Sequence, residues 1–109
     1  MVLERAVLSV QPGREADFEA AFATAREQLS ASPGFAGATL SRGVESSSTY
    51  VLLAEWATLE DHTEGFRGSP AFGEWRRQLG PFFASPPDVE HFVQVATAAP
   101  NGDAAGPGQ

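Results

Sequence analysis

The sequence predicts one small α+β domain, a ferredoxin-like βαββαβ fold with an antiparallel four-stranded sheet. Apolar residues alternate in several short segments and recur at helical spacing in others, and Pro and Gly separate these segments. The 109 residues suffice for one domain but not for two. We expect residues 1–96 to form this domain, and residues 97–109, rich in Ala, Gly and Pro without periodicity, to form a disordered tail.

The first half of the chain predicts a strand, a helix and a second strand. Leu3–Val10 is a short β-prone run that stops at the Pro-Gly turn beginning at Pro12. Arg14–Leu29 has apolar residues at helical spacing, with acidic residues early and Arg26 late, an order that suits the helix dipole. A Ser-Pro-Gly break follows, and Phe35–Arg42 then predicts the second strand.

Thr49–Trp56 predicts a third strand with two largely apolar faces. One face carries Tyr50, Leu52, Ala54 and Trp56, and the other carries Val51, Leu53 and Glu55. The predicted helices suffice to cover only one face of the sheet. We therefore expect a homodimer in which a partner's sheet packs on the other face.

The remaining segments complete the predicted fold. Thr58, followed three residues later by Asp61, resembles a capping box that opens a helix over residues 59–67. Ser69 is a second N-cap, before Pro70 at the first position of a helix over residues 71–79. Alternation over Val89–Val95 predicts the fourth strand.

The composition argues against several classes of function. The chain has no cysteine, which excludes disulfides, thiol nucleophiles and iron–sulfur clusters and leaves zinc only His62, His91 and carboxylates. The net charge is -7, and the seven positive residues are all arginines that form no basic stripe, so we expect no nucleic-acid partner. The N-terminus lacks the pattern of a secretory signal, and no apolar run reaches about 18 residues. We expect a cytoplasmic protein without a membrane partner.

Four motifs follow one another along the chain: Pro12-Gly13-Arg14-Glu15, Glu55-Trp56, Ser69-Pro70-Ala71-Phe72 and Val89-Glu90-His91-Phe92. Their order and spacing resemble the antibiotic biosynthesis monooxygenase family. The resemblance covers residues 3–96 and implies a dimeric α+β barrel with an apolar pocket between each sheet and its helices. It also implies oxygenase chemistry that needs neither flavin nor metal, so no cofactor is expected.

The residue types and their spacing point to a general base independently of the resemblance. A deprotonated, electron-rich phenol or hydroquinol can itself reduce dioxygen, so the protein need supply only a base, a dry aromatic pocket and oxyanion donors. Leu59, His62 and Phe66 are spaced to share one helical face, which directs His62 toward an apolar pocket. An ordinary pKa of about 6.5 makes His62 the first choice as the catalytic base. The competing interpretation is a core histidine that fills space.

The other candidate pocket residues are mostly aromatic, and each has a structural alternative. The tryptophans and phenylalanines are equally suited to the core, the arginines (including Arg76 and Arg77) to a solvated surface, and the second histidine to a structural or dimer-interface role. The candidates are Trp56, Phe66, Arg67, Phe72, Trp75, Phe82, Phe83 and His91.

The function that these residues favour is a cofactor-independent monooxygenase that uses dioxygen on a small aromatic substrate: a phenolic, quinol or polyketide-like molecule. One alternative is a non-catalytic binding module for a hydrophobic metabolite or haem; another is a structural dimerisation unit. The resembling haem-degrading relatives use an asparagine near the position of Ala6 and a histidine near that of Arg76. Neither residue is present here, which argues against haem cleavage of that kind.

Overall fold

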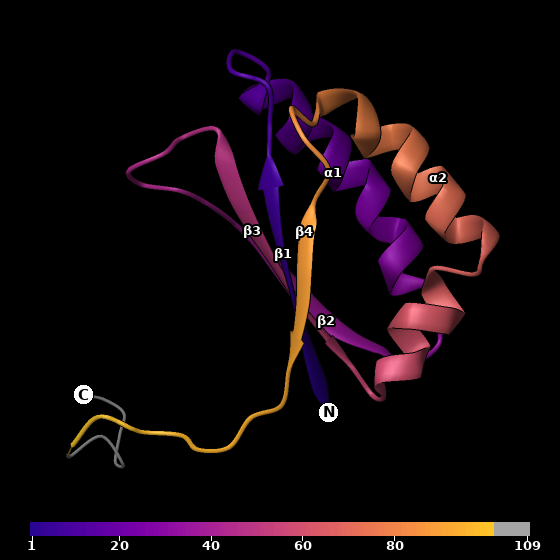
Figure 1. The fold of residues 1–109 in the computed structure, drawn as a ribbon, viewed down its shortest axis with the longest axis vertical. Helices are drawn as coiled ribbons and strands as arrows, with labels where there is room; N and C mark the ends of the chain where they lie inside the picture. The colour runs from indigo at the N-terminus through magenta and orange to yellow at the C-terminus, as the bar shows by residue number, and fades with distance from the viewer. Residues whose placement is uncertain (102–109) are drawn as a thin grey trace.

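A computed structural model describes residues 1–101 and confirms the predicted βαββαβ order. The strands form one antiparallel sheet in the order β2-β3-β1-β4, and the helices cover one of its faces (Figure 1). Among the described residues, no helix has the length and apolar character needed to cross a bilayer. The elements are β1 (Val2–Ser9), α1 (Glu15–Ser30), β2 (Phe35–Arg42), β3 (Thr49–Trp56), the π-helix η1 (Asp61–Phe66), α2 (Pro70–Leu79), the 3-10 turn η2 (Gly80–Phe82) and β4 (Asp88–Phe92).

Strand β4 is shorter than predicted, since it ends at Phe92 and not at Val95. It pairs antiparallel with β1 in a register that sets Leu3 opposite Phe92, so β1 has no residue left to pair with Val95. Val95 is accordingly 92% exposed. Residues 97–101 have no helix or strand, and the rest of the predicted tail, residues 102–109, lies outside the described residues.

The segment before α2 differs in kind from the predicted α-helix. Thr58 Oγ1 accepts a hydrogen bond from the Asp61 backbone N–H at 3.1 Å, as expected of a cap. The chain then widens into a π-helix, in which the backbone N–H of Arg67 donates to the carbonyl of His62 at 3.1 Å. Leu59 precedes this turn and is 39% exposed, so the expectation that it shares the buried face of His62 was wrong.

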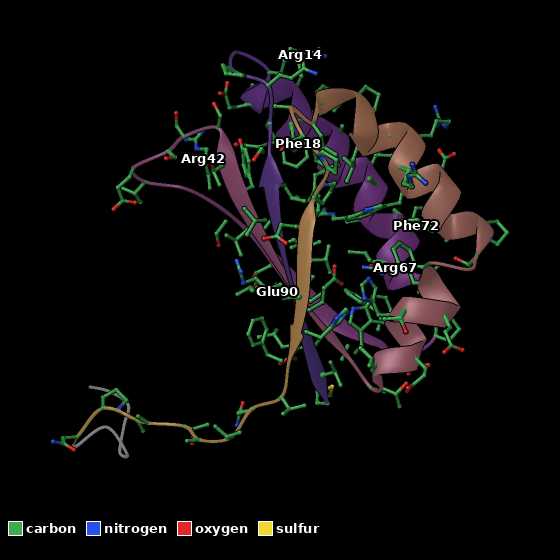
Figure 2. All side chains as sticks on the ribbon, viewed as in Figure 1. Arg14, Phe18, Arg42, Arg67, Phe72 and Glu90 are labelled. Atoms are coloured by element: carbon green, nitrogen blue, oxygen red, sulfur yellow. The ribbon has the colours of Figure 1, made fainter. Side chains whose placement is uncertain are left out.

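The core lies between the sheet and the helices, as Figure 2 shows for Phe18 and Phe72. The predicted inner face of β3 is confirmed, because its four residues are all buried. The largest fully buried side chains are Trp56, Tyr50, Phe18, Leu79 and Val10. The same layer holds the Ser69 cap, whose Oγ accepts from the Phe72 backbone N–H and fixes the start of α2 over the sheet.

The opposite face of the sheet is not covered by any helix in the described part of the chain (Figure 1). Its central strands present Val7, Val51 and Leu53, all only partly exposed. At the edge, Arg5 and Glu90 form an ion pair at 2.5 Å, and Figure 2 shows Glu90 on the side of β4 away from the helices. This half-buried apolar surface is the one on which the sequence places a partner's sheet.

Gly34 brings the start of β2 against the start of η1. Its φ of +83° lies in the left-handed region, and a Cβ at this position would approach the Cβ of Asp61 to 2.8 Å. Gly13 has a similar φ of +91°, but a Cβ there would meet nothing within 4 Å. An alanine at Gly13 would therefore meet backbone strain alone, whereas an alanine at Gly34 would meet backbone strain and steric overlap.

We expect Gly34→Ala to lower the free energy of unfolding by about 2 to 4 kcal/mol, because it adds overlap with Asp61 to the cost of a left-handed backbone. Gly13→Ala is the matched control and should cost only the backbone part, about 1 to 2 kcal/mol. Urea denaturation of both variants checks this. Equal losses would mean that the Asp61 side chain moves aside freely and does not hold η1 in place.

Candidate active site

A buried carboxylate marks the site. Alternation along β1 places Glu4 on the same inner face as the apolar residues Ala6 and Leu8, and it is only 5% exposed. A carboxyl group at such a position is costly to bury unless it is hydrogen-bonded. Trp56, from the neighbouring strand β3, donates from its Nε1 to Oε1 of Glu4 at 3.0 Å. His62 Nε2 lies 3.3 Å from the same oxygen.

Two aromatic rings and a second histidine hold His62 in place. The indole of Trp56 stacks on its ring with centroids 5.1 Å apart, and the ring of Phe66 stacks at 6.2 Å. Nδ1 of His62 lies 2.8 Å from Nε2 of His91, which comes from the edge strand β4. Both ring nitrogens of His62 thus have protein partners, and the ring is only 3% exposed.

Burial and one nearby cation set the protonation of these groups. Burial raises the pKa of Glu4, and the Trp56 hydrogen bond and the charge of Arg67 partly oppose this. Burial also lowers the pKa of His62 to about 4, with smaller effects from Arg67 and His91. Burial and then Arg67 lower the pKa of His91 as well. His62 is therefore neutral at pH 7, with a pKa well below the ordinary value assumed from the sequence.

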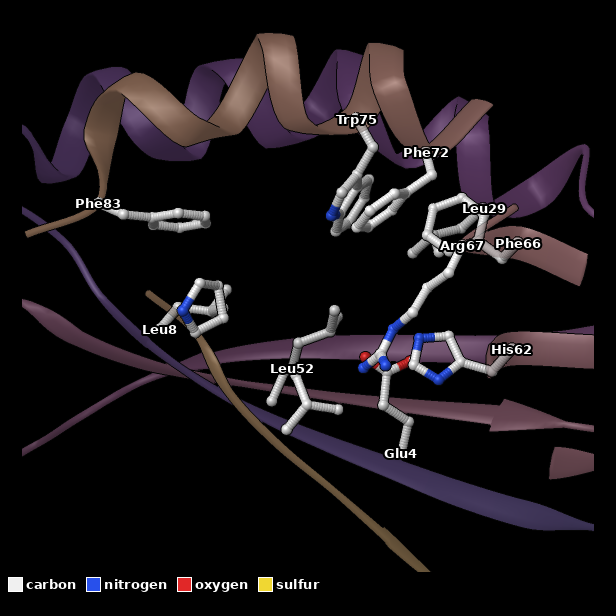
Figure 3. Close-up of a pocket in the computed structure, with 13 residues that line it drawn as sticks. Glu4, Leu8, Leu29, Leu52, His62, Phe66, Arg67, Phe72, Trp75 and Phe83 are labelled. Carbon is white, nitrogen blue, oxygen red and sulfur yellow. The ribbon is translucent and has the colours of Figure 1, made fainter. Parts of the chain in front are cut away.

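Glu4, His62 and Arg67 lie at the polar end of a cavity of about 210 Å³ between sheet and helices. Figure 3 shows the guanidinium of Arg67 beside the His62 ring and the Glu4 carboxylate. The side chains of Trp75 and Phe72 reach into the cavity from α2, and the rest of its lining is largely apolar. One end of the cavity is thus polar and able to accept a proton, whereas the rest favours a flat hydrophobic ligand.

A second groove of about 480 Å³ adjoins this cavity. It shares Phe72, Trp75 and Phe83 with the inner cavity and extends past Arg76 to the Pro-rich connector before β4. Arg76 itself lies over the ring of Phe72, 5.7 Å from its centroid. The aromatic side chains of α2 therefore separate a small inner space from a larger outer one.

The structure places only some of the residues predicted from the sequence around the cavity. Trp56 and His91 do not line the cavity; Trp56 stacks on the His62 ring, and His91 contacts its Nδ1. His91 therefore lies on the helix-covered face of the sheet and not on the open one. Phe82 packs on Phe18 and beneath Arg14, away from the cavity. Of the other arginines, Arg76 borders the outer groove, and Arg77 is paired with Glu74 on the surface. Those that line the cavity are His62, Phe66, Arg67, Phe72, Trp75 and Phe83.

Sequence reasoning missed Glu4, although a signal for it exists. In the first strand, Glu4 is the one charged residue in the alternating series that continues with Ala6, Leu8 and Val10. A carboxylate at an inward position of an otherwise apolar strand is a reason to expect a buried polar partner from another segment. Within residues 1–101, no three histidine, cysteine or acidic side chains gather as a metal site would require.

The fold and this site define a class: a small ferredoxin-like α+β protein with an aromatic cavity that ends in buried proton-accepting groups. Residues 1–78 match the antibiotic biosynthesis monooxygenase family, and the chain belongs to that family. This assignment supports a monooxygenase-type function.

Similar proteins agree with this assignment. Protein YczJ of Bacillus subtilis (strain 168), described as uncharacterized, is 46% identical over 87% of this chain and all of its own. A solved structure from Bordetella bronchiseptica, assigned to the antibiotic biosynthesis monooxygenases, is 43% identical with a TM-score of 0.85, covering 87% of this chain and 97% of that one. SnoaB, a cofactor-independent oxygenase from Streptomyces nogalater, is 25% identical with a TM-score of 0.76, covering 88% of this chain and 94% of its own.

The lowered pKa of His62 predicts how stability depends on pH. Between its ordinary value of 6.5 and about 4, the unfolded chain binds a proton on this histidine that the folded protein does not. The free energy of unfolding should therefore fall as the pH decreases through this window, by roughly 3 kcal/mol from His62. Glu4, with its raised pKa, contributes with the opposite sign.

Urea unfolding of the wild type and of His62→Gln, from about pH 7 to about pH 4, isolates this contribution, because Glu4 is present in both proteins. The advantage of the wild type over the variant should shrink steadily on acidification. A constant difference across the range would contradict a neutral, buried His62.

Proposed function

We propose that this protein is a cofactor-independent monooxygenase acting on a small phenolic, quinol or polyketide-like molecule. One observation carries the proposal: a buried carboxylate–histidine pair and an arginine meet at the end of an otherwise apolar aromatic cavity. Removing the proton from an electron-rich phenol makes it able to donate an electron to dioxygen. The chemistry then needs a base, a stabilising cation and exclusion of water.

The group best placed to take the substrate's proton is Glu4, with His62 as its partner. Glu4 and His62 both line the cavity, but both ring nitrogens of His62 face protein groups. The contacts of Glu4 with Trp56 and His62 both use Oε1, so its other oxygen is better placed to meet a substrate. Burial raises the pKa of Glu4, which makes it a stronger base than an exposed carboxylate. The sequence-based assignment of His62 as the base is thereby refined to a Glu4–His62 pair.

Arg67 would stabilise the anion that deprotonation creates. Its guanidinium lies at the same end of the cavity as Glu4 and His62 (Figure 3), and its charge lowers the pKa of His62. A fixed positive charge near a developing phenolate favours ionisation of the substrate in the same way. Trp56, Phe66 and Phe72 supply the dry aromatic surroundings in which such a charge acts strongly.

The sizes of the two spaces suggest how a substrate is held. An engineered apolar cavity of about 150 Å³ admits benzene, so the inner cavity of about 210 Å³ suits one substituted ring. The rest of a larger molecule would occupy the outer groove across Phe72 and Trp75, with Phe83 at the junction. The ring to be oxidised would then lie beside Glu4 and Arg67.

The test is oxygen uptake with a panel of hydroquinones and anthrones under metal-free conditions. Glu4→Gln keeps the shape and an acceptor for Trp56 but removes the base, so we expect turnover to fall about 100-fold or more. Glu60→Gln makes the same chemical change at an exposed position and should leave turnover unchanged. Thermal unfolding of each preparation verifies that the variants fold.

The outcome also separates the alternatives. A protein that shifts the absorbance of these ligands without consuming oxygen would be a binding module, which contradicts the proposal. The contacts of His62 argue against a haem-binding role, because Nε2 lies against Glu4 and Nδ1 lies against His91, so neither nitrogen is directed at the cavity to bind iron.

We further propose that the protein is a homodimer joined through the open face of the sheet. The support is the half-buried apolar surface of Val7, Val51 and Leu53, which no helix in the described part covers. Sedimentation at micromolar concentration should give about twice the chain mass of 11.5 kDa. Leu53→Glu should yield monomers, because it buries a charge in the interface. A wild-type protein that stays monomeric would contradict the barrel arrangement.

A further inference from the structure

Three titratable side chains form a continuous line from the cavity toward the edge of the sheet. Glu4 lines the cavity, His62 Nε2 lies 3.3 Å from its Oε1, and His62 Nδ1 lies 2.8 Å from Nε2 of His91. Exposure increases along the line, because Glu4 and His62 are 5% and 3% exposed, whereas His91 is partly exposed. The polar atoms of Glu4, His62 and His91 thus contact one another in order, with no apolar group between them.

The location of His91 gives this line an outlet. His91 belongs to β4, an edge strand of the sheet, and pairs across the ladder with Glu4 itself. The chain beyond β4 leaves the sheet (Figure 1), and Phe92, the next residue, is 45% exposed. The end of the line therefore lies at an edge that solvent reaches, whereas its beginning lies inside the protein.

We propose that Glu4, His62 and His91 form a proton relay that carries the substrate's proton from the cavity to solvent at strand β4. This inference rests on the function proposed above, since that function requires a proton to leave a water-poor cavity. His62 then passes the proton from Glu4 to His91. His91 is a positioning and relay residue that does not touch the substrate.

The substrate O–H bond breaks and its proton joins a carboxylate oxygen of Glu4, leaving the phenolate. The carboxyl proton passes to His62 Nε2 while the proton on His62 Nδ1 passes to His91 Nε2, and His91 then releases its Nδ1 proton to solvent. One proton leaves for each one taken, and no electron moves. Both histidines start with their ring proton on Nδ1 and end with it on Nε2, and both return to the starting tautomer by exchange with water before the next cycle. The 3.3 Å contact between Glu4 and His62 is of the kind that shortens when a substrate binds.

The groups around the two histidines favour transfer of a proton along the line over its retention on either ring. The groups that act on the two histidines are Glu4 from β1, Arg67 from the end of η1, and the histidines themselves. Arg67 lowers the pKa of both rings, and burial does so more strongly. A proton therefore does not remain on either ring at neutral pH, which suits a relay and not a permanent ion pair.

The first arm of the test measures kinetics. His91→Phe keeps an aromatic ring but cannot relay, and we expect oxygen uptake to fall about 10-fold or more, with partial recovery on addition of imidazole. His91→Gln distinguishes relay from support, because an amide can hydrogen-bond His62 but cannot pass a proton on. A rate as low as that of His91→Phe supports the relay. A His91→Gln rate equal to that of the wild type overturns it and leaves His91 a supporting residue.

The second arm does not depend on activity. Nuclear magnetic resonance of the ring nitrogens reports the tautomer of each histidine during a pH titration. Protonation of His91 turns its Nε2 into a donor, so His62 should change from the Nδ1–H to the Nε2–H form at the same midpoint. A tautomer of His62 that stays constant while His91 titrates overturns the relay. If instead the wild type consumes no oxygen while the tautomers are coupled, the oxygenase proposal fails and the relay geometry remains.

Discussion

The hydrogen bond between Trp56 and Glu4 is the interaction on which the site depends. A carboxyl group on the inner face of a central strand is stable only with polar partners, and the chain supplies them from two other elements. Trp56 reaches from β3, and His62 reaches from η1, which must therefore lie against this end of the sheet. The stack of Trp56, His62 and Phe66 then fills the same corner with aromatic area. One buried polar group thus dictates where a whole irregular segment packs.

The strands and helices were predictable because they follow simple periodicities. The inner face of β3 alternates cleanly, and Ser69 before Pro70 marks the start of α2, so both appear in the structure as expected. The end of β4 was not predictable, because it depends on the length of its pairing partner β1. Local alternation up to Val95 contains no information about that register.

The candidate site was predictable in its residue types but not in its arrangement. The sequence singles out His62 and the aromatic side chains near it, and the fold does bring most of them to one cavity. What the sequence cannot show is the register of β4 against β1, which sets His91 opposite Glu4 and next to His62, or that burial lowers the pKa of His62 to about 4. Both follow from contacts between segments far apart in the chain. The role of Glu4 is not evident from its own segment, because its partners Trp56 and His62 come from segments far along the chain.

The π-helix at Asp61–Phe66 has a consequence for how such a cavity changes over evolutionary time. Its wide turn links the backbones of His62 and Arg67, five residues apart, so both side chains face Glu4. In an ordinary α-helix the same spacing would rotate Arg67 by roughly 140° away from His62. A return of this turn to α-helical hydrogen bonding at the same length would therefore rotate the cation away from the cavity without altering any strand. Loss of one residue would instead restore a four-residue spacing, which keeps both side chains on one face. The backbone form and the length of this one turn together decide whether a cation reaches the cavity, which gives descendants of the same fold a short mutational route between cavities with and without one.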